Sequence, residues 1–271
     1  IWLNFSKIIL YDEPAVPELE INRLQKFLAN TFHVNVIVKN NLFNGINDDI
    51  IEEIASCRVF DLKSPFKKYK PNNEQINFER NYCKNTKFIE EIPTPETAEN
   101  LDDLVIYDGF EIKNILESVI PKDKTANDCL HIIFTNKLTC TYDYGDFRYH
   151  GRAVICSNPS IISTSGIVEA PAKSREYYLD IMKAKSQTLD LKSIKKKYQN
   201  TFLDYHDKRT SKIIEGYLLQ AIFYYITGDP FCENLDCRLN NAHWQKDLLY
   251  SQLEFSKLCG KHHSILEKLH L

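Results

Sequence analysis

The chain has 271 residues and a formal charge of −3 at pH 7, from 34 lysines and arginines against 37 aspartates and glutamates. Its 43% of hydrophobic and 12% of aromatic residues are typical of a globular protein and exclude a disordered, collagen-like or coiled-coil chain. The near-neutral charge does not favour a nucleic-acid partner, and no apolar run reaches the roughly 20 residues of a spanning helix. The first residues do not resemble a signal peptide. We therefore expect a cytoplasmic protein without a nucleic-acid or membrane partner.

The N-terminal part predicts a β-α-β unit. An apolar run over residues 7–11 predicts a strand, apolar residues at helical spacing predict a helix over residues 17–32, and alternating valines predict a strand over residues 34–38. A second helix is predicted over residues 48–56. Residues 63–95 are rich in Lys, Asn and Pro and show no sustained period, so we expect a loop-rich insertion there.

The middle of the chain predicts a helix and several short strands. The helical pattern covers residues 110–120, and strands are predicted over residues 130–134, 138–142 and 152–156. The first two of these strands are joined through only a few polar residues. Residues 159–178 mix small, apolar and charged residues without one period, and we expect this segment to wrap around a cleft.

The last third is mostly helical. Residues 175–200 predict an amphipathic helix, and the lysine run at 195–197 is most simply a solvated face. Residues 209–227 form a pattern that is apolar on both sides, so we expect a buried helix. Gly228 has the position of a C-terminal cap, and Pro230 prevents the helix from continuing.

Four residues near the C-terminus have the spacing of zinc ligands. Cys232 and Cys237 are separated by four residues, Cys259 and His262 by two, and 21 residues lie between the two pairs. Zinc prefers thiolate sulfur and imidazole nitrogen in a closed tetrahedron, so the pattern predicts one structural Zn²⁺. The alternative is that four unrelated residues belong to an ordinary core.

Two other histidines leave the ligand set open. His243 and His263 lie close in sequence to the two pairs, and either could replace His262 or support a ligand from outside the metal site. The remaining cysteines lack a paired histidine in any recognisable motif, and a soluble chain of this size with eight cysteines indicates reduced thiols rather than a disulfide framework.

The order of residues around the first cysteine pair is more specific. Residues 221–239 read AIFYYITGDPFCENLDCRL. This segment resembles the archaemetzincin family of zinc metallopeptidases, whose pattern is H-E-x-x-H-x-x-G-x3-C-x4-C-x-M-x17-C-x-x-C. The positions that keep the family register are Gly228, Cys232 and Cys237. Leu239 stands where the family has Met, and Cys259 and His262 follow after 19 residues instead of 17.

The resemblance covers most of the chain in the order of its elements, and it implies an α+β fold with an α/β-like start. It implies a zincin-like, mixed, twisted sheet packed by helices, with a zinc-stapled helical region at the C-terminus. The expected organisation is one domain over residues 1–271, made of the β-α-β start (1–62), the insertion (63–95), strands with a connecting helix (96–208), and the degenerate active-site helix with the zinc region (209–271). Residues 161–178 and 202–244 are also similar to uncharacterised archaeal proteins labelled metallopeptidases.

The departures from the family pattern concern the catalytic metal. On this register Ala221 and Tyr225 replace the two histidines of the motif, Ile222 replaces its glutamate, and Phe231 takes the place of the third ligand. A catalytic zinc needs about three protein ligands, an open position for water and a base. The resemblance therefore implies a catalytically inactive, zinc-binding protein that binds a peptide or protein partner in the former substrate groove.

The competing hypothesis is a hydrolase with relocated site residues, either a metallopeptidase or a metal-free enzyme. The candidate residues are His131, His150, Glu169 and His206. His150 and Glu169 could serve as acid and base if the fold brought them together in a cleft. The plainer interpretation is that His131 and His150 lie on ordinary strands and that the others are surface residues.

Overall fold

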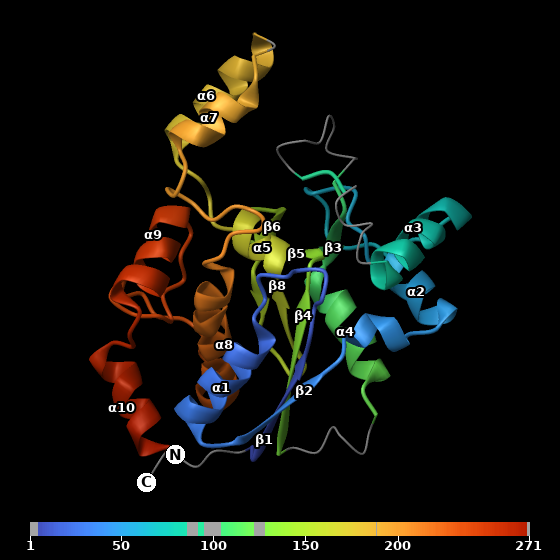
Figure 1. Cartoon of the computed structure of the whole chain (residues 1–271). Helices are drawn as coiled ribbons and strands as arrows, with labels where there is room; N and C mark the ends of the chain where they lie inside the picture. Colours follow the sequence, from blue (N-terminus) through green and yellow to red (C-terminus); the bar gives the residue numbers. More distant parts are fainter. Residues whose placement is uncertain (1–4, 86–91, 95–103, 122–127, 188, 270–271) are drawn as a thin grey trace.

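A five-stranded sheet forms the centre of the molecule (Figure 1). Its strands, in spatial order, are β2 (Asn35–Lys39), β1 (Lys7–Tyr11), β4 (Cys129–Thr135), β8 (Ser160–Ser163) and β7 (Val154–Ile155). The first four are parallel, and β7 pairs antiparallel with β8 at one edge. The structure is a computed structural model that describes residues 5–85, 92–94, 104–121, 128–187 and 189–269.

Alternating side chains of the central strand pack against two helical layers. Ile8 and Leu10 join the core beneath α1 (Ile21–Phe32) and α8 (Thr210–Thr227), whereas Ile9 and Tyr11 face the core formed with α2 (Asp48–Ala55) and α4 (Gly109–Val119). Because successive side chains of a strand point to opposite faces, a sheet with apolar residues at every position must be covered on both sides. The mixed α+β fold with helices on a mixed sheet is therefore confirmed.

A smaller sheet extends the fold. It contains β3 (Ile106–Asp108), β5 (Leu138–Asp143) and β6 (Arg148–Arg152), with β3 parallel and β6 antiparallel to β5. The predicted strands over 130–134 and 138–142 exist as β4 and β5, but they lie in different sheets and do not pair with each other. The short connection between them carries Lys137, whose buried side chain forms an ion pair with Glu79.

The loop-rich insertion predicted over residues 63–95 is wrong in part, because it contains helix α3 (Asn73–Lys84). Asn72 and Gln75 form a reciprocal capping box at its start. The sequence does not predict this helix, because the charged Glu79 at one of its buried positions interrupts the apolar pattern. The boundary predicted at residues 95 and 96 lies outside the described residues.

Other element boundaries differ from the predictions. The first helix begins at Ile21 rather than at residue 17, and the helix predicted over residues 175–200 is split into α6 (Arg175–Ser186) and α7 (Leu191–Lys197). The strand predicted at residues 152–156 belongs to two strands, because β6 ends at Arg152 and β7 follows it. The irregular segment over residues 159–178 contains β8, the short helix α5 (Thr164–Glu169) and the start of α6. A 3-10 turn, η1 (Leu42–Gly45), follows β2.

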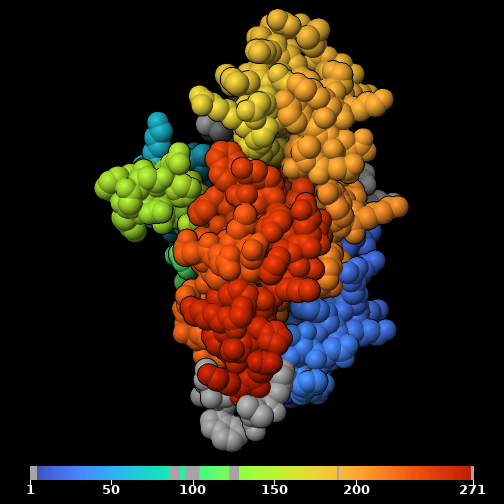
Figure 2. All heavy atoms as spheres, turned by 90° about the vertical axis from the view of Figure 1, so that its left-hand side faces the viewer, coloured from blue at the N-terminus to red at the C-terminus, as the bar shows by residue number. Residues whose placement is uncertain are grey.

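The predicted buried helix is α8, of whose 18 residues 13 are buried. Gly228 caps its C-terminus in the left-handed conformation with φ of 78°, as its position predicted. After α8 the chain forms α9 (Gln245–Leu249), the π-helical turn η5 (Tyr250–Phe255) and α10 (Gly260–Lys268). Figure 2 shows these C-terminal residues, in red, as a continuous surface between α1 and the α6–α7 hairpin. Among the described helices, none combines the length and apolar character needed to cross a membrane.

Candidate metal centre

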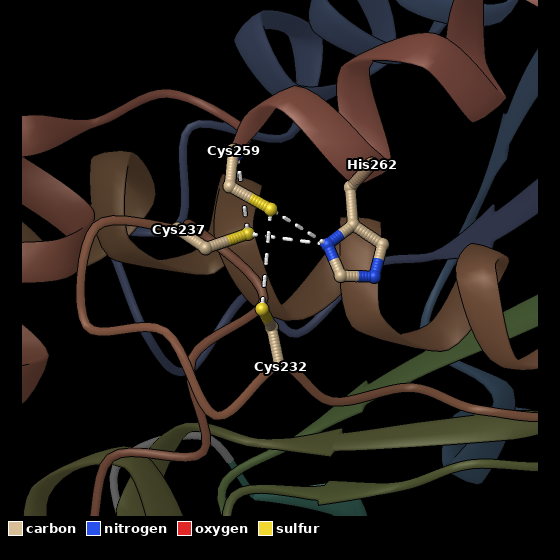
Figure 3. Close-up of side chains that lie close together, drawn as sticks. All are labelled: Cys232, Cys237, Cys259 and His262. Atoms are coloured by element: carbon tan, nitrogen blue, oxygen red, sulfur yellow. Dashed lines mark hydrogen bonds between the residues drawn. The ribbon is translucent and has the colours of Figure 1, made fainter.

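Four side chains from the C-terminal region converge on one point (Figure 3). Cys232 and Cys237 come from the loop after α8, Cys259 directly precedes α10, and His262 lies in the first turn of α10. Their sulfur and ring nitrogen atoms all lie within 4.8 Å of one another. The Cys232 and Cys259 sulfurs are 4.0 Å apart, and His262 Nδ1 lies 3.5 Å from Cys237 Sγ and 3.2 Å from Cys259 Sγ.

These separations fit a tetrahedral zinc site. Zn–S bonds of about 2.3 Å and Zn–N bonds of about 2.05 Å at tetrahedral angles place two sulfurs about 3.8 Å apart and a sulfur and a nitrogen about 3.6 Å apart. The three separations given above match these values within a few tenths of an ångström, and all ligand atoms lie within 4.8 Å of one another. Three sulfurs and one nitrogen form a closed donor set without an open position, which is the arrangement of a structural rather than a catalytic zinc.

The protonation states of the cluster also suit a metal ion. Burial raises the pKa of the Cys237 thiol to about 12, so without a cation this fully buried sulfur keeps its proton. Burial and the nearby Lys261 lower the pKa of His262, so its imidazole is neutral and offers a lone pair to a metal at neutral pH. Metal binding at Cys237 would therefore be coupled to proton release.

The cluster is packed directly against α8. The ring of His262 meets Phe223 of α8 edge to face, with centroids 5.6 Å apart. Arg238, next to Cys237 in the chain, forms a buried ion pair with Glu215 of α8 at 3.1 Å and donates to the carbonyl oxygen of Lys212 at 2.8 Å. The metal loop is thus held to the helix by aromatic packing on one side and by a buried charge pair on the other.

A glycine in α8 makes room for this contact. A Cβ atom at Gly216 would lie 1.8 Å from Gln252 Oε1, so only glycine allows the carboxamide of Gln252 to approach the helix. Gln252 Nε2 donates to the carbonyl oxygen of Arg238 at 2.8 Å, and its Oε1 lies 3.4 Å from Arg238 Nε. The roles of Gly216, Gln252 and Arg238 could not be predicted from the sequence, because no local pattern links positions this far apart.

The positions that the family resemblance assigned to a catalytic metal carry apolar and aromatic side chains that pack against their neighbours. Ala221 and Ile222 are fully buried in the core between α8 and the large sheet. Tyr225 packs edge to face on Phe5, with ring centroids 5.7 Å apart. Phe231 is half-buried and lines a pocket beside the helix. Apolar side chains cannot ligate zinc, and the described surroundings of these residues supply no replacement ligand set.

The pocket beside α8 is a cavity of about 120 Å³, which we call the helix-side pocket. Its wall is formed by Gly151 and Arg152 of β6, by Tyr217 and Gln220 of α8, and by Phe231. The remaining lining residues are His150, Ala153, Val154, Ala170, Pro171, Asn241, Ala242 and His243. The segment expected to wrap a cleft thus contributes to a pocket, at Ala170 and Pro171.

The relocated-site candidates do not form a metal-ligand group within the described residues. His131 is buried on β4, where Tyr11 Oη lies 3.1 Å from its Nδ1. His150 lies on β6, Glu169 ends α5, and His206 lies 3.4 Å from a glutamate of another segment, Glu18. Within the described residues no metal-compatible group contains two of these four candidates. The two spare histidines stand outside the cysteine cluster, since His243 is exposed at the helix-side pocket and His263 pairs with Glu267.

A second group of possible ligands lies in the turn between β5 and β6. Asp143, Asp146 and His150 place their ligand atoms within 4.8 Å of one another, but both carboxylates are exposed. Hydrogen bonds from His150 and Arg148 lower the pKa of Asp146. These contacts are typical of a surface turn whose charged side chains pair with one another.

Comparisons with known proteins match one family over almost the whole chain. A family profile described as "Probable metallopeptidase family (DUF6775)" matches residues 4–269, which is almost the whole chain. Among solved structures, the chain is similar to the crystal structure of a zinc-dependent peptidase from Methanocorpusculum labreanum (strain Z), at 12% identity and a TM-score of 0.40, over 96% of this chain and 99% of that one. The search of curated proteins found no match.

Proposed function

The chain belongs to the probable metallopeptidase family, and we propose that it is an archaemetzincin-like, zinc-binding protein without a catalytic metal that binds a peptide or protein partner. The compartment that we propose is the cytoplasm, where thiols stay reduced and available to a metal. The observation that carries the proposal is the contrast within one helix and its loop. The Cys₃His cluster is geometrically complete, while Ala221 and Ile222 are fully buried in an apolar core.

One structural Zn²⁺ would be held by Cys232, Cys237, Cys259 and His262. Bound there, the ion would supply only charge neutralisation and cross-linking, since four protein donors leave no position for water or substrate. It would connect the loop after α8 to the start of α10. Structural zinc sites in small domains contribute on the order of 10 to 16 kcal/mol of apparent binding energy at neutral pH, so the ion would dominate the stability of this region.

The partner would bind at the helix-side pocket. Gly151 is exposed on β6 and lines the pocket, so its backbone is accessible there. Tyr217 and Phe231 supply apolar contact area, and Gln220 lines the wall between them. A site that combines two aromatic side chains with accessible backbone and polar side chains suits an extended peptide segment.

The test combines metal content with peptidase activity. Mass spectrometry of untagged protein is expected to find one zinc per chain in the parent and none in the Cys237→Ala, Cys259→Ala double variant. Hydrolysis of fluorescent casein is expected to stay at background in the parent, with and without added zinc. A Phe231→Ala variant is expected to weaken binding of labelled casein peptides, measured by fluorescence anisotropy, while the exposed control Met182→Ala binds as the parent does.

The opposite outcome would favour the hydrolase hypothesis. Two metal ions in the parent, with one surviving in the double cysteine variant, would reveal a second metal site. Casein hydrolysis that increases with added zinc would have the same meaning. Either result would refute the proposed loss of catalysis but would leave the structural zinc in place.

A further inference from the structure

A second cavity, of about 290 Å³, lies between the small sheet and α6, and we call it the sheet-side pocket. Most of its wall is apolar. The apolar lining residues are Leu62, Leu104, Ile106, Leu138, Cys140, Tyr149, Tyr177, Tyr178 and Ile181. Ligand-binding pockets are concave and mostly apolar, so an apolar pocket of this size is suited to receive an apolar group from outside.

Charged residues are gathered at this apolar wall. The charged residues among its lining are Glu169, Lys173 and Lys185, which leaves an excess of one positive charge. Lys173 is only 3% exposed, and its ammonium group lies 5.2 Å from the ring centroid of Tyr177 and 4.7 Å from that of Phe202. Glu169 and Lys173 already have interaction partners, so the positive charge that the wall offers to an anion is that of the exposed Lys185.

The mouth of the pocket is formed by two exposed residues of α6. Lys185 and Tyr178 are both solvent-exposed and both line the cavity. The backbone N–H of Lys173 donates to Tyr178 Oη at 3.1 Å, which holds the tyrosine ring at the rim. Figure 1 shows α6 and α7 projecting from the end of the molecule that carries the small sheet. The hairpin therefore supplies the basic side of the pocket, while the sheet supplies its apolar floor.

We propose that the sheet-side pocket binds a ligand with a compact apolar body and a carboxylate, with the apolar body between Leu138 and Ile181 and the carboxylate near Lys185. This chemistry is shared by the C-terminal residue of a peptide with a large apolar side chain and by a free aromatic or aliphatic acid. The proposal uses neither the zinc nor the helix-side pocket, and it goes beyond the proposed function.

Isothermal titration calorimetry with matched probes tests this proposal. The probes are 4-phenylbutyrate, its neutral amide 4-phenylbutanamide, and N-acetyl-phenylalanine, which represents a peptide C-terminus. Both acids are expected to bind more tightly than the amide, by about fivefold for one charge contact near the surface. Tighter binding of N-acetyl-phenylalanine would identify a peptide end as the natural ligand, and tighter binding of 4-phenylbutyrate would identify a free acid.

Two pairs of variants locate the site. Lys185→Gln is expected to weaken binding of the acids about fivefold and to leave the amide unchanged, whereas Lys183→Gln, on the same helix but outside the pocket, leaves all probes unchanged. Leu138→Trp fills the cavity and is expected to abolish binding of every probe, whereas Leu179→Trp, exposed on α6, does not.

The overturning results are equally specific. If the acids and the amide bind with the same affinity, or if no probe binds up to its solubility, the proposed ligand class is wrong. Circular dichroism checks that Leu138→Trp is folded, and Leu62→Trp, on a different segment of the wall, replaces it if it is not. Unchanged binding in the folded cavity-filling variant would place the ligand elsewhere.

Discussion

A buried carboxyl group at the end of β1 makes the stability of the fold dependent on pH. Glu13 is 5% exposed, and its Oε1 accepts hydrogen bonds from Asn41 Nδ2 at 3.0 Å and from the backbone N–H of Ala15 at 3.3 Å. Burial raises its pKa from 4.5 to about 7, even though these donors and the charge of Lys137 act in the opposite direction. Glu13→Gln keeps an oxygen at the same place and removes the titrating proton.

The direction of the pH dependence of stability follows from the raised pKa of Glu13. The folded state binds the proton of Glu13 more tightly than the unfolded state, so its stabilising contribution is complete below pH 4.5 and is lost as the pH rises to 7. A shift of about 2.5 pH units corresponds to about 3 kcal/mol. Relative to the parent, Glu13→Gln should therefore gain about 3 kcal/mol in free energy of unfolding between pH 4 and pH 8.

The assay for this prediction is urea unfolding of both proteins at several pH values. Other titrating groups contribute equally to parent and variant, so they cancel in the difference between the two free energies. A difference that does not change with pH would refute the reasoning, because it would mean that Glu13 has the same proton affinity in the folded and unfolded states.

Three further predictions concern packing, a buried charge and the metal. Gly216→Ala should destabilise the parent by about 1 to 2 kcal/mol, because the new methyl group displaces the Gln252 carboxamide. In a Gln252→Ala background the same substitution should be neutral or stabilising, because alanine favours the helix. Equal losses of unfolding free energy in both backgrounds, measured by urea unfolding, would contradict this. Lys137→Met should lower the free energy of unfolding by about 3 to 5 kcal/mol, because it leaves the charge of the fully buried Glu79 without its ion-pair partner. Adding Glu79→Gln should restore more than half of this free energy. If the second substitution restores none of it, the ion pair is not the cause of the loss. Chelation of zinc by phenanthroline should lower the melting temperature of the parent and expose three more thiols to Ellman's reagent. The double variant of Cys237 and Cys259 should show neither change. A parent that is insensitive to chelation would argue against the structural ion.

Local and repetitive signals in the sequence were sufficient for several elements. The strand at residues 7–11 and the buried helix that ends at Gly228 were found because an unbroken apolar pattern and a capping glycine depend only on neighbouring residues. The cysteine spacing also identified four side chains that converge in space. A metal ligand set is recognisable because its chemistry restricts the residue types at each position.

Features that depend on distant partners were not predictable in the same way. Helix α3 carries Glu79 on its buried face, which breaks the apolar pattern, and its partner Lys137 lies 58 residues away between two strands of different sheets. Lys137 Nζ lies 3.6 Å from the ring centroid of Tyr82, so the charge is held by aromatic faces as well as by the carboxylate. From the sequence alone, both charged residues indicate surface positions.

Under the proposed function, the chain keeps a structural metal site and binds no catalytic metal, and the packing around the two sets of positions accounts for this difference. A catalytic metal touches the fold through a few side chains on one helix, and apolar residues such as Ala221 and Ile222 can replace them within an ordinary core. The cysteine cluster, by contrast, connects the loop after α8 to the start of α10, two segments that also contact α8 through Arg238, His262 and apolar packing. Removing a ligand there would disconnect these two segments from each other rather than change one position in the core. A test of this view is hydrogen exchange on the metal-free protein: protection should be lost first in α10 and the loop after α8, while β1 and β4 remain protected.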